Sequence, residues 1–155
     1  MVYMKSKREN IAEYILYLWQ IEDYLRAFPQ QAETNAELHD FAEIMHREGV
    51  FTAGHTSLAT NALVEMEQLH DELLDQEAQY RAMVIRLRPS LTLFKSKTDR
   101  PAMSDIEASL TLLYKIMLLR LQQKTVSQET ALVQQQATQL LRTLSRYYYD
   151  NQTAV

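Results

Sequence analysis

Two copies of a Glu-x-x-His motif are the residues best suited to metal chemistry, at Glu43–His46 and Glu67–His70. A di-iron carboxylate bundle places this motif on two helices and takes one further Glu from each of two others. The residues available for that role are Glu13 or Glu22, and Glu107. Helical spacing, however, puts Glu43 about 160° and Glu67 about 140° from the apolar stripes of their helices. We therefore expect both motifs to lie on solvated helix faces, and we predict no metal site and no cofactor.

A second group of residues has the chemistry of a small-ligand site: Trp19, Glu22, Asp23, Arg26 and His55. Most of it lies in the stretch from Glu9 to Ala27, which is rich in apolar and aromatic residues and contains the single Trp. Apolar residues in this stretch recur at helical spacing and form one stripe: Ile11, Ile15, Leu18, Ile21 and Leu25. Glu22 falls inside the stripe, so its carboxylate is predicted to point at the core.

A buried carboxylate needs a partner, because burial without one drives it to neutralise. Arg26 follows Glu22 by one helical turn and is the predicted partner. A structural ion pair is the favoured interpretation. The alternative is the polar floor of a pocket beside Trp19, with Asp23 and His55 nearby. His55 follows Gly54 at an expected helix start, where its ring can bond a free backbone group or line a cleft.

Catalytic residues cannot be assigned from the sequence. It has no readable Ser-His-Asp or Cys-His arrangement, and two glycines are too few for a glycine-rich phosphate loop. The net charge of −4 argues against a nucleic-acid partner, since phosphate affinity comes from clustered Lys and Arg. A membrane span needs roughly 20 apolar residues, and Glu22, Asp23 and Arg26 interrupt the best stretch. With no cysteine in the chain, we expect a soluble cytoplasmic protein.

The elements that position these residues are all predicted to be helices. Capping boxes begin at Ser6, Thr34 and Ser104, and Ser127 is a further N-cap. The expected helices are a first one ending before Pro29, then 35–48, 55–97, 105–124 and 128–149. Within 55–97 we expect a kink at Pro89 in one continuing helix, with a break near Asp75 as the alternative. The prediction is a single all-α domain over residues 1–155, an antiparallel bundle of five to six helices.

Charge is segregated along the 55–97 segment. Six acids and no base lie between Glu65 and Glu77, and six bases with one acid lie between Arg81 and Arg100. A two-fold antiparallel contact would set each block against its opposite, so we predict a homodimer, with another protein as a possible partner. The leading functional prediction is a non-enzymatic interaction or scaffold protein that self-associates. The alternative is a ligand-binding protein or enzyme built on Glu22 and Arg26.

Three segments resemble an uncharacterised bacterial family, the domain of unknown function 4924 family. They are Glu9–Ala27, the turn Glu48-Gly49-Val50 with Gly54-His55, and Ser104–Lys124. The family has a polar break where this chain reads Asp75-Gln76-Glu77, which supports the two-helix alternative. The resemblance implies an all-helical cytosolic protein and carries over no activity, cofactor or catalytic residue.

Overall fold

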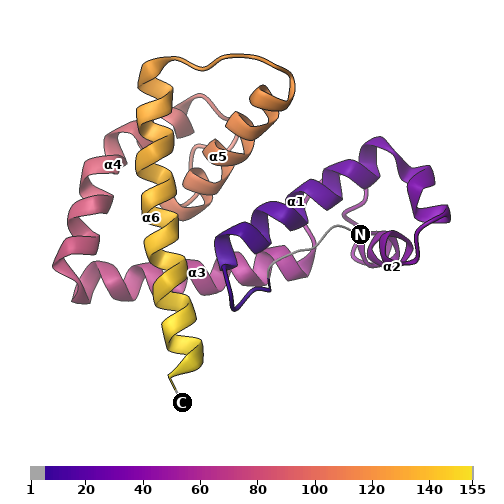
Figure 1. Ribbon diagram of the computed structural model, residues 1–155, viewed down its shortest axis with the longest axis horizontal. Coiled ribbons are helices and arrows are strands. Elements are labelled where there is room, and N and C mark those ends of the chain that lie inside the picture. Colours follow the sequence, from indigo (N-terminus) through magenta and orange to yellow (C-terminus); the bar gives the residue numbers. More distant parts are fainter. Residues whose placement is uncertain (1–5, 155) are drawn as a thin grey trace. The chain divides into compact units, whose positions relative to one another are not determined.

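The computed structural model describes residues 6–154, and these residues contain six α-helices, one short 3-10 helix and no strand. The order along the chain is α1 (Ile11–Ala27), η1 (Pro29–Glu33), α2 (Ala36–Arg47), α3 (Ser57–Gln76), α4 (Ala78–Ser96), α5 (Asp105–Leu121) and α6 (Gln128–Thr153) (Figure 1). The all-α prediction is confirmed. The contacts divide the chain into two compact units, Met1–Val64 and Glu65–Val155, with the boundary inside α3. The single domain over 1–155 stays a prediction.

Polar side chains cap the helices close to the predicted positions. Ser104 Oγ accepts the Glu107 N–H at 3.1 Å and Ser127 Oγ accepts the Thr130 N–H at 3.1 Å, as expected. The starts of α1 and α2 differ: the N-cap of α2 is Asn35, which accepts the Leu38 N–H at 3.1 Å, and not the predicted Thr34. Asn10 is the N-cap of α1 and accepts the Glu13 N–H at 3.1 Å, whereas Ser6 caps only a preceding turn. The Asn10 side chain, four residues after Ser6, offers the same kind of acceptor, so the prediction of Ser6 as the N-cap of the first helix was wrong.

The 55–97 segment is two helices rather than one. The backbone of Glu77 is extended, with φ −118° and ψ 106°, and separates α3 from α4. Arg81 donates from Nε to the Leu74 carbonyl at 2.7 Å and from Nη2 to the Asp75 carbonyl at 2.9 Å, so it satisfies carbonyls that the end of α3 leaves free. The prediction of one continuous helix was wrong, and the break near Asp75 was the correct alternative. Pro89 lies inside α4, which continues past it as predicted.

The first unit holds α1 over α2 through an apolar cluster of Ile21, Leu25, Ala42 and Met45, bordered by Phe41, Val50 and Phe51. In the second unit α4, α5 and α6 contact one another pairwise (Figure 1). The buried stripe of α4 is Tyr80, Val84, Leu87 and Leu91. Both units thus form cores from helical stripes, and in the first unit α1 carries the candidate site.

Candidate functional site

Glu22 is fully buried, as its place in the α1 stripe predicts. One carboxylate oxygen, Oε1, lies 2.7 Å from His55 Nδ1, and the other, Oε2, accepts the backbone N–H of the buried Thr56 at 2.8 Å. Thr56 stands at the start of α3, where backbone N–H groups lack partners within the helix. The carboxylate therefore joins α1 to the first turn of α3.

Arg26 bonds the loop between α2 and α3 instead of Glu22, so the predicted Glu22–Arg26 pair was wrong. Its guanidinium donates to the carbonyls of Phe51 at 3.0 Å, of Val50 at 2.8 Å and of Gly54. It also donates to Asp23 Oδ1 at 3.1 Å. The loop runs alongside α1 with its carbonyls toward the arginine and its last N–H toward the glutamate. Glu22 and Arg26 therefore each bond backbone groups of the loop, which lie closer to them than the two side chains lie to each other.

The loop itself is shaped by the two glycines of the chain. Gly49 has φ +71° and Gly54 has φ +94°, values that L side chains rarely adopt. Glu48 at the start of this loop accepts the Ser57 N–H at 2.7 Å and the Ser57 hydroxyl at 2.6 Å. These two hydrogen bonds from Ser57 lower the pKa of Glu48. The glycine pair was the sequence signal for a tight loop, but it did not indicate which side chains bind it.

His55 connects this polar cluster to Trp19. The two rings stack with centroids 4.9 Å apart and planes 22° apart, and 41% of the His55 side chain is exposed. Nδ1 faces the Glu22 carboxylate, which can only accept hydrogen bonds, so the arrangement favours a proton on Nδ1. The structure thus brings Trp19, Glu22 and His55 together, and places Asp23 and Arg26 in an adjoining contact with the loop. All five groups bond or stack within the first unit, and Glu22 and Arg26 bond the loop directly.

The two Glu-x-x-His motifs lie in different surroundings. On α2, Glu43 pairs with His39 at 3.2 Å, and His46 stacks on Phe51 with centroids 4.1 Å apart. On α3, His70 is buried, which corrects the expectation of a solvated position. Across residues 6–154, no group of three or more His, Cys, Asp or Glu side chains is placed to hold a metal ion.

His70 belongs to a second polar cluster, which the sequence did not reveal. Its Nδ1 lies 2.6 Å from the hydroxyl of Tyr80 on α4. Burial raises the pKa of Tyr80 above its usual range, helped by the charges of Asp105 and Asp71, so the phenol stays protonated and donates to the imidazole. Burial also lowers the pKa of His70, against the opposing charges of Asp71 and Asp105. The pair is a neutral hydrogen bond across the α3–α4 break.

Asp105 is the charged neighbour of that pair and is the N-terminal residue of α5. It accepts from Lys95 Nζ at 2.7 Å and from Arg88 Nε at 3.1 Å. Burial alone would raise the pKa of this carboxyl, but the hydrogen bonds and charges of Lys95 and Arg88 outweigh burial and lower it. Two of the bases in the expected basic block are therefore used inside the second unit.

The neutral state of His70 predicts an acid-sensitive stability. A histidine whose pKa in the folded protein is below its ordinary 6.5 binds a proton more readily in the unfolded state. Its contribution to the free energy of unfolding is therefore fully present above pH 6.5 and is lost as the pH falls below 6.5. Between about pH 7 and about pH 5 the free energy of unfolding is expected to fall more steeply in the natural protein than in His70→Gln. Urea unfolding at several pH values measures both slopes. Equal slopes would contradict the assignment of a buried neutral imidazole.

Comparison with known proteins identifies the family. A family model described as a domain of unknown function (DUF4924) matches residues 1–37 and 28–154. The chain belongs to this family. Comparisons of this DUF4924 chain with curated proteins and with solved structures gave no match.

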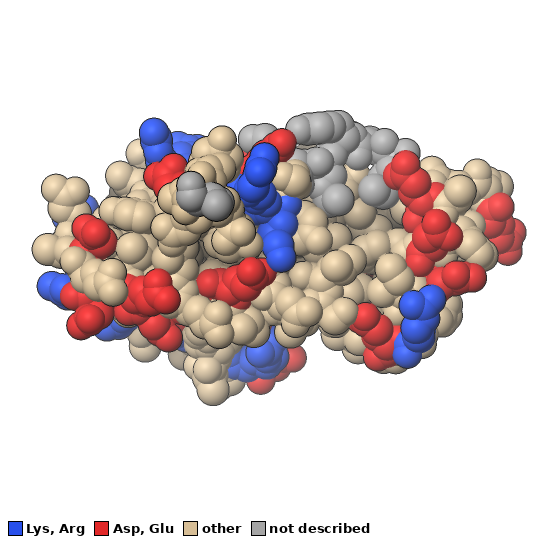
Figure 2. All heavy atoms as spheres, turned by 90° about the horizontal axis from the view of Figure 1, so that it is seen from below, with Lys and Arg blue, Asp and Glu red and all other residues tan. Residues whose placement is uncertain are grey.

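Two surface properties of the DUF4924 chain bear on its partners. Among residues 6–154 no helix has both the length and the apolar character needed to cross a membrane. On the face drawn in Figure 2, basic and acidic side chains lie interspersed, and the basic ones form small groups instead of one continuous surface. That face lacks the broad basic patch that nucleic-acid affinity requires.

Proposed function

We propose that this protein is a non-enzymatic helical interaction protein of the cytosol, and that it self-associates through the outer face of α4. The observation that supports it is a pair of large apolar side chains in water: Ile85 is 57% and Leu93 is 59% exposed. Pro89, also exposed, lies midway between them. Spacings of four residues place all three on one stripe, on the side of α4 away from its buried stripe. A contiguous exposed apolar stripe is typical of an interaction surface.

The spacing of this stripe favours a second copy of the same chain as the partner. Ile85 and Leu93 are each four residues from Pro89. When two α4 helices cross antiparallel at Pro89, Ile85 of each copy meets Leu93 of the other. A two-fold contact of this kind is self-complementary, because one surface serves both copies.

The charges at the two ends of α4 are compatible with this arrangement but do not specify it. Exposed acids gather where α3 meets α4, at Asp71, Glu72, Asp75 and Glu77, and exposed Lys97 follows the other end of α4. With the crossing at Pro89, Lys97 of one copy lies opposite Arg81 of the other, and Glu77 of that copy lies one helical turn beyond Arg81. Exposed pairs contribute only about 0–1 kcal/mol each, so they would orient the encounter more than hold it. The dimer predicted from the sequence sets the acidic and basic blocks of one long helix against each other. The arrangement proposed here uses α4 alone.

Aspartate substitutions in the stripe test the proposal. Leu93→Asp and Ile85→Asp are each expected to weaken dimerisation at least about tenfold, since burying such a side chain contributes about 1.5–3 kcal/mol. Sedimentation over a range of protein concentrations measures the dissociation constant. Leu121→Asp is the matched control, because Leu121 is 69% exposed but ends α5. A natural protein that stays monomeric at every concentration would refute the proposal, as would unchanged association in both stripe variants.

The alternative function, a ligand site built on Glu22 and Arg26, has less support. Both side chains are engaged with loop backbone or with neighbouring side chains. His55 is more exposed than Glu22, so a ligand could reach the Glu22 carboxylate only past the His55 ring.

A further inference from the structure

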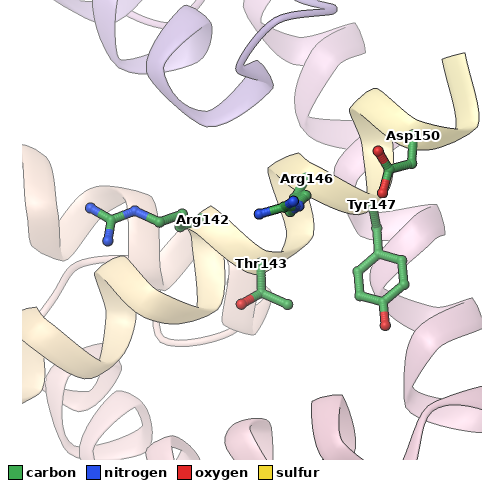
Figure 3. A pocket seen from close by; sticks show the side chains of 5 residues that line it. All are labelled: Arg142, Thr143, Arg146, Tyr147 and Asp150. Carbon is green, nitrogen blue, oxygen red and sulfur yellow. The ribbon is translucent and has the colours of Figure 1, made fainter. Parts of the chain in front are cut away.

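Helix α6 carries an isolated positive segment on a chain of net charge −4. Between Thr130 and Tyr149 its only charged residues are Arg142 and Arg146. They are four residues apart, about one helical turn, so their side chains leave the same side of the helix. Figure 3 shows the two arginines on successive turns of α6, with the Arg142 side chain extended to the left and that of Arg146 foreshortened.

The two arginines line a cavity of about 400 Å³ together with Thr143, Tyr147 and Asp150. Within residues 6–154 neither guanidinium has a hydrogen-bond or ion-pair partner. Five of the eight other arginines have such partners: Arg26, Arg81, Arg88, Arg100 and Arg120. Within residues 6–154, Arg8, Arg47 and Arg86 share the lack of a partner, but they do not line this cavity. The donors of Arg142 and Arg146 are thus available to a ligand, in a volume typical of small-molecule sites.

A second cavity of about 550 Å³ shares Arg142 with the first. Its remaining lining is Ala131, Gln134, Gln135, Thr138, Gln139 and a further arginine, Arg120, which donates to Gln134 Oε1 at 2.8 Å. Amide and hydroxyl groups both donate and accept hydrogen bonds, which suits a ligand with several hydroxyl groups. Arg142 stands at the junction between this amide-rich cavity and the arginine pair.

We propose that Arg142 and Arg146 bind the phosphate group of a small, hydroxyl-rich molecule such as a sugar phosphate. Guanidinium groups hold phosphate oxygens through paired charge-assisted hydrogen bonds, and the hydroxyls of Thr143 and Tyr147 add further donors at the same cavity. Asp150 lies beyond Tyr147 at the end away from Arg142 (Figure 3). Its charge disfavours an anion there, so the phosphate lies at the arginines and the hydroxyls extend into the amide-rich cavity.

Calorimetric titration of the full chain at low salt tests this site with three probes: glucose 6-phosphate, inorganic phosphate and glucose. Glucose 6-phosphate is expected to bind most tightly, inorganic phosphate more weakly and glucose not measurably. Arg142→Gln and Arg146→Gln should each weaken binding of glucose 6-phosphate at least about tenfold, the effect of losing hydrogen bonds to a charged group. Arg146→Lys keeps the charge but loses the paired donors, and should fall between the natural protein and Arg146→Gln.

Arg47→Gln is the matched control, because Arg47 is an exposed arginine on α2 and its loss changes the net charge equally. Its affinity for glucose 6-phosphate should equal that of the natural protein, and circular dichroism should show all variants folded. The proposal is overturned if none of the three probes binds at millimolar concentration, or if Arg47→Gln weakens binding as much as the α6 variants do. Equal affinity for inorganic phosphate and glucose 6-phosphate would keep the phosphate site and overturn the role of the amide-rich cavity.

Discussion

Glu22→Ala is expected to lower the free energy of unfolding by about 3 kcal/mol, the largest effect of any polar substitution proposed for this chain. The change removes the acceptor for the buried Thr56 N–H and the partner of His55 Nδ1. It also leaves a cavity at a position with no solvent exposure. Urea unfolding followed by circular dichroism measures the loss. Faster hydrogen exchange of the Thr56 amide would locate the effect at the start of α3.

Glu22→Gln separates hydrogen bonding from charge at the same position. The amide keeps an oxygen for the Thr56 N–H and presents an NH₂ group to His55, whose tautomer can adjust to accept. We expect a loss of about 1 kcal/mol, well short of the alanine variant. Equal losses in the two variants would mean that charge, and not the acceptor, holds this junction. A loss below about 1 kcal/mol in Glu22→Ala would contradict its burial.

Arg26→Ala is expected to lower the free energy of unfolding by about 2 kcal/mol. The guanidinium donates to three loop carbonyls, those of Val50, Phe51 and Gly54, from a side chain that is 19% exposed. Without it, these carbonyls must turn to water, and the loop between α2 and α3 loosens. Thermal or urea unfolding measures the stability, and proteolysis in the 50–54 segment reports the loop.

Arg26→Lys should recover only part of that loss, because one ammonium group cannot reach the separated carbonyls as the planar guanidinium does. Arg47→Ala supplies the control at an exposed arginine, where a change within about 0.5 kcal/mol is expected. If Arg26→Ala behaved like Arg47→Ala, the loop contacts would contribute nothing to stability.

Glu22 and Arg26 have the chemistry of a ligand site, but their contacts in the structure give them a structural role. Glu22 and Arg26 lie one turn apart on α1. Arg26 binds carbonyls along the loop and Glu22 binds its last residues, and Gly49 and Gly54 allow the loop to turn sharply. Their charges match backbone groups: a carboxylate for the N–H at the start of α3, and a guanidinium for carbonyls. The polar cluster needs no ligand to account for its composition.

Local sequence patterns are enough to predict the helical class, most helix ends and the burial of Glu22. Each of these follows from local geometry, because the 3.6-residue repeat places Glu22 among Ile15, Leu18 and Leu25 whatever the rest of the chain does. Caps such as Ser104 and Ser127 act within three residues of themselves, so their effect is also readable along the chain.

The pairing of polar groups depends on long-range contacts that local patterns do not contain. The loop partners of Glu22 and Arg26 lie 24 to 34 residues away, in a segment whose path no local pattern specifies. The apolar stripe also remains in phase across Glu77, so periodicity predicted one helix. Two contacts span the break at Glu77: Arg81 bonds the end of α3, and Tyr80 bonds His70. Periodicity indicates which face of a helix is apolar. The partner of a polar group depends instead on which other polar group the folded chain places beside it.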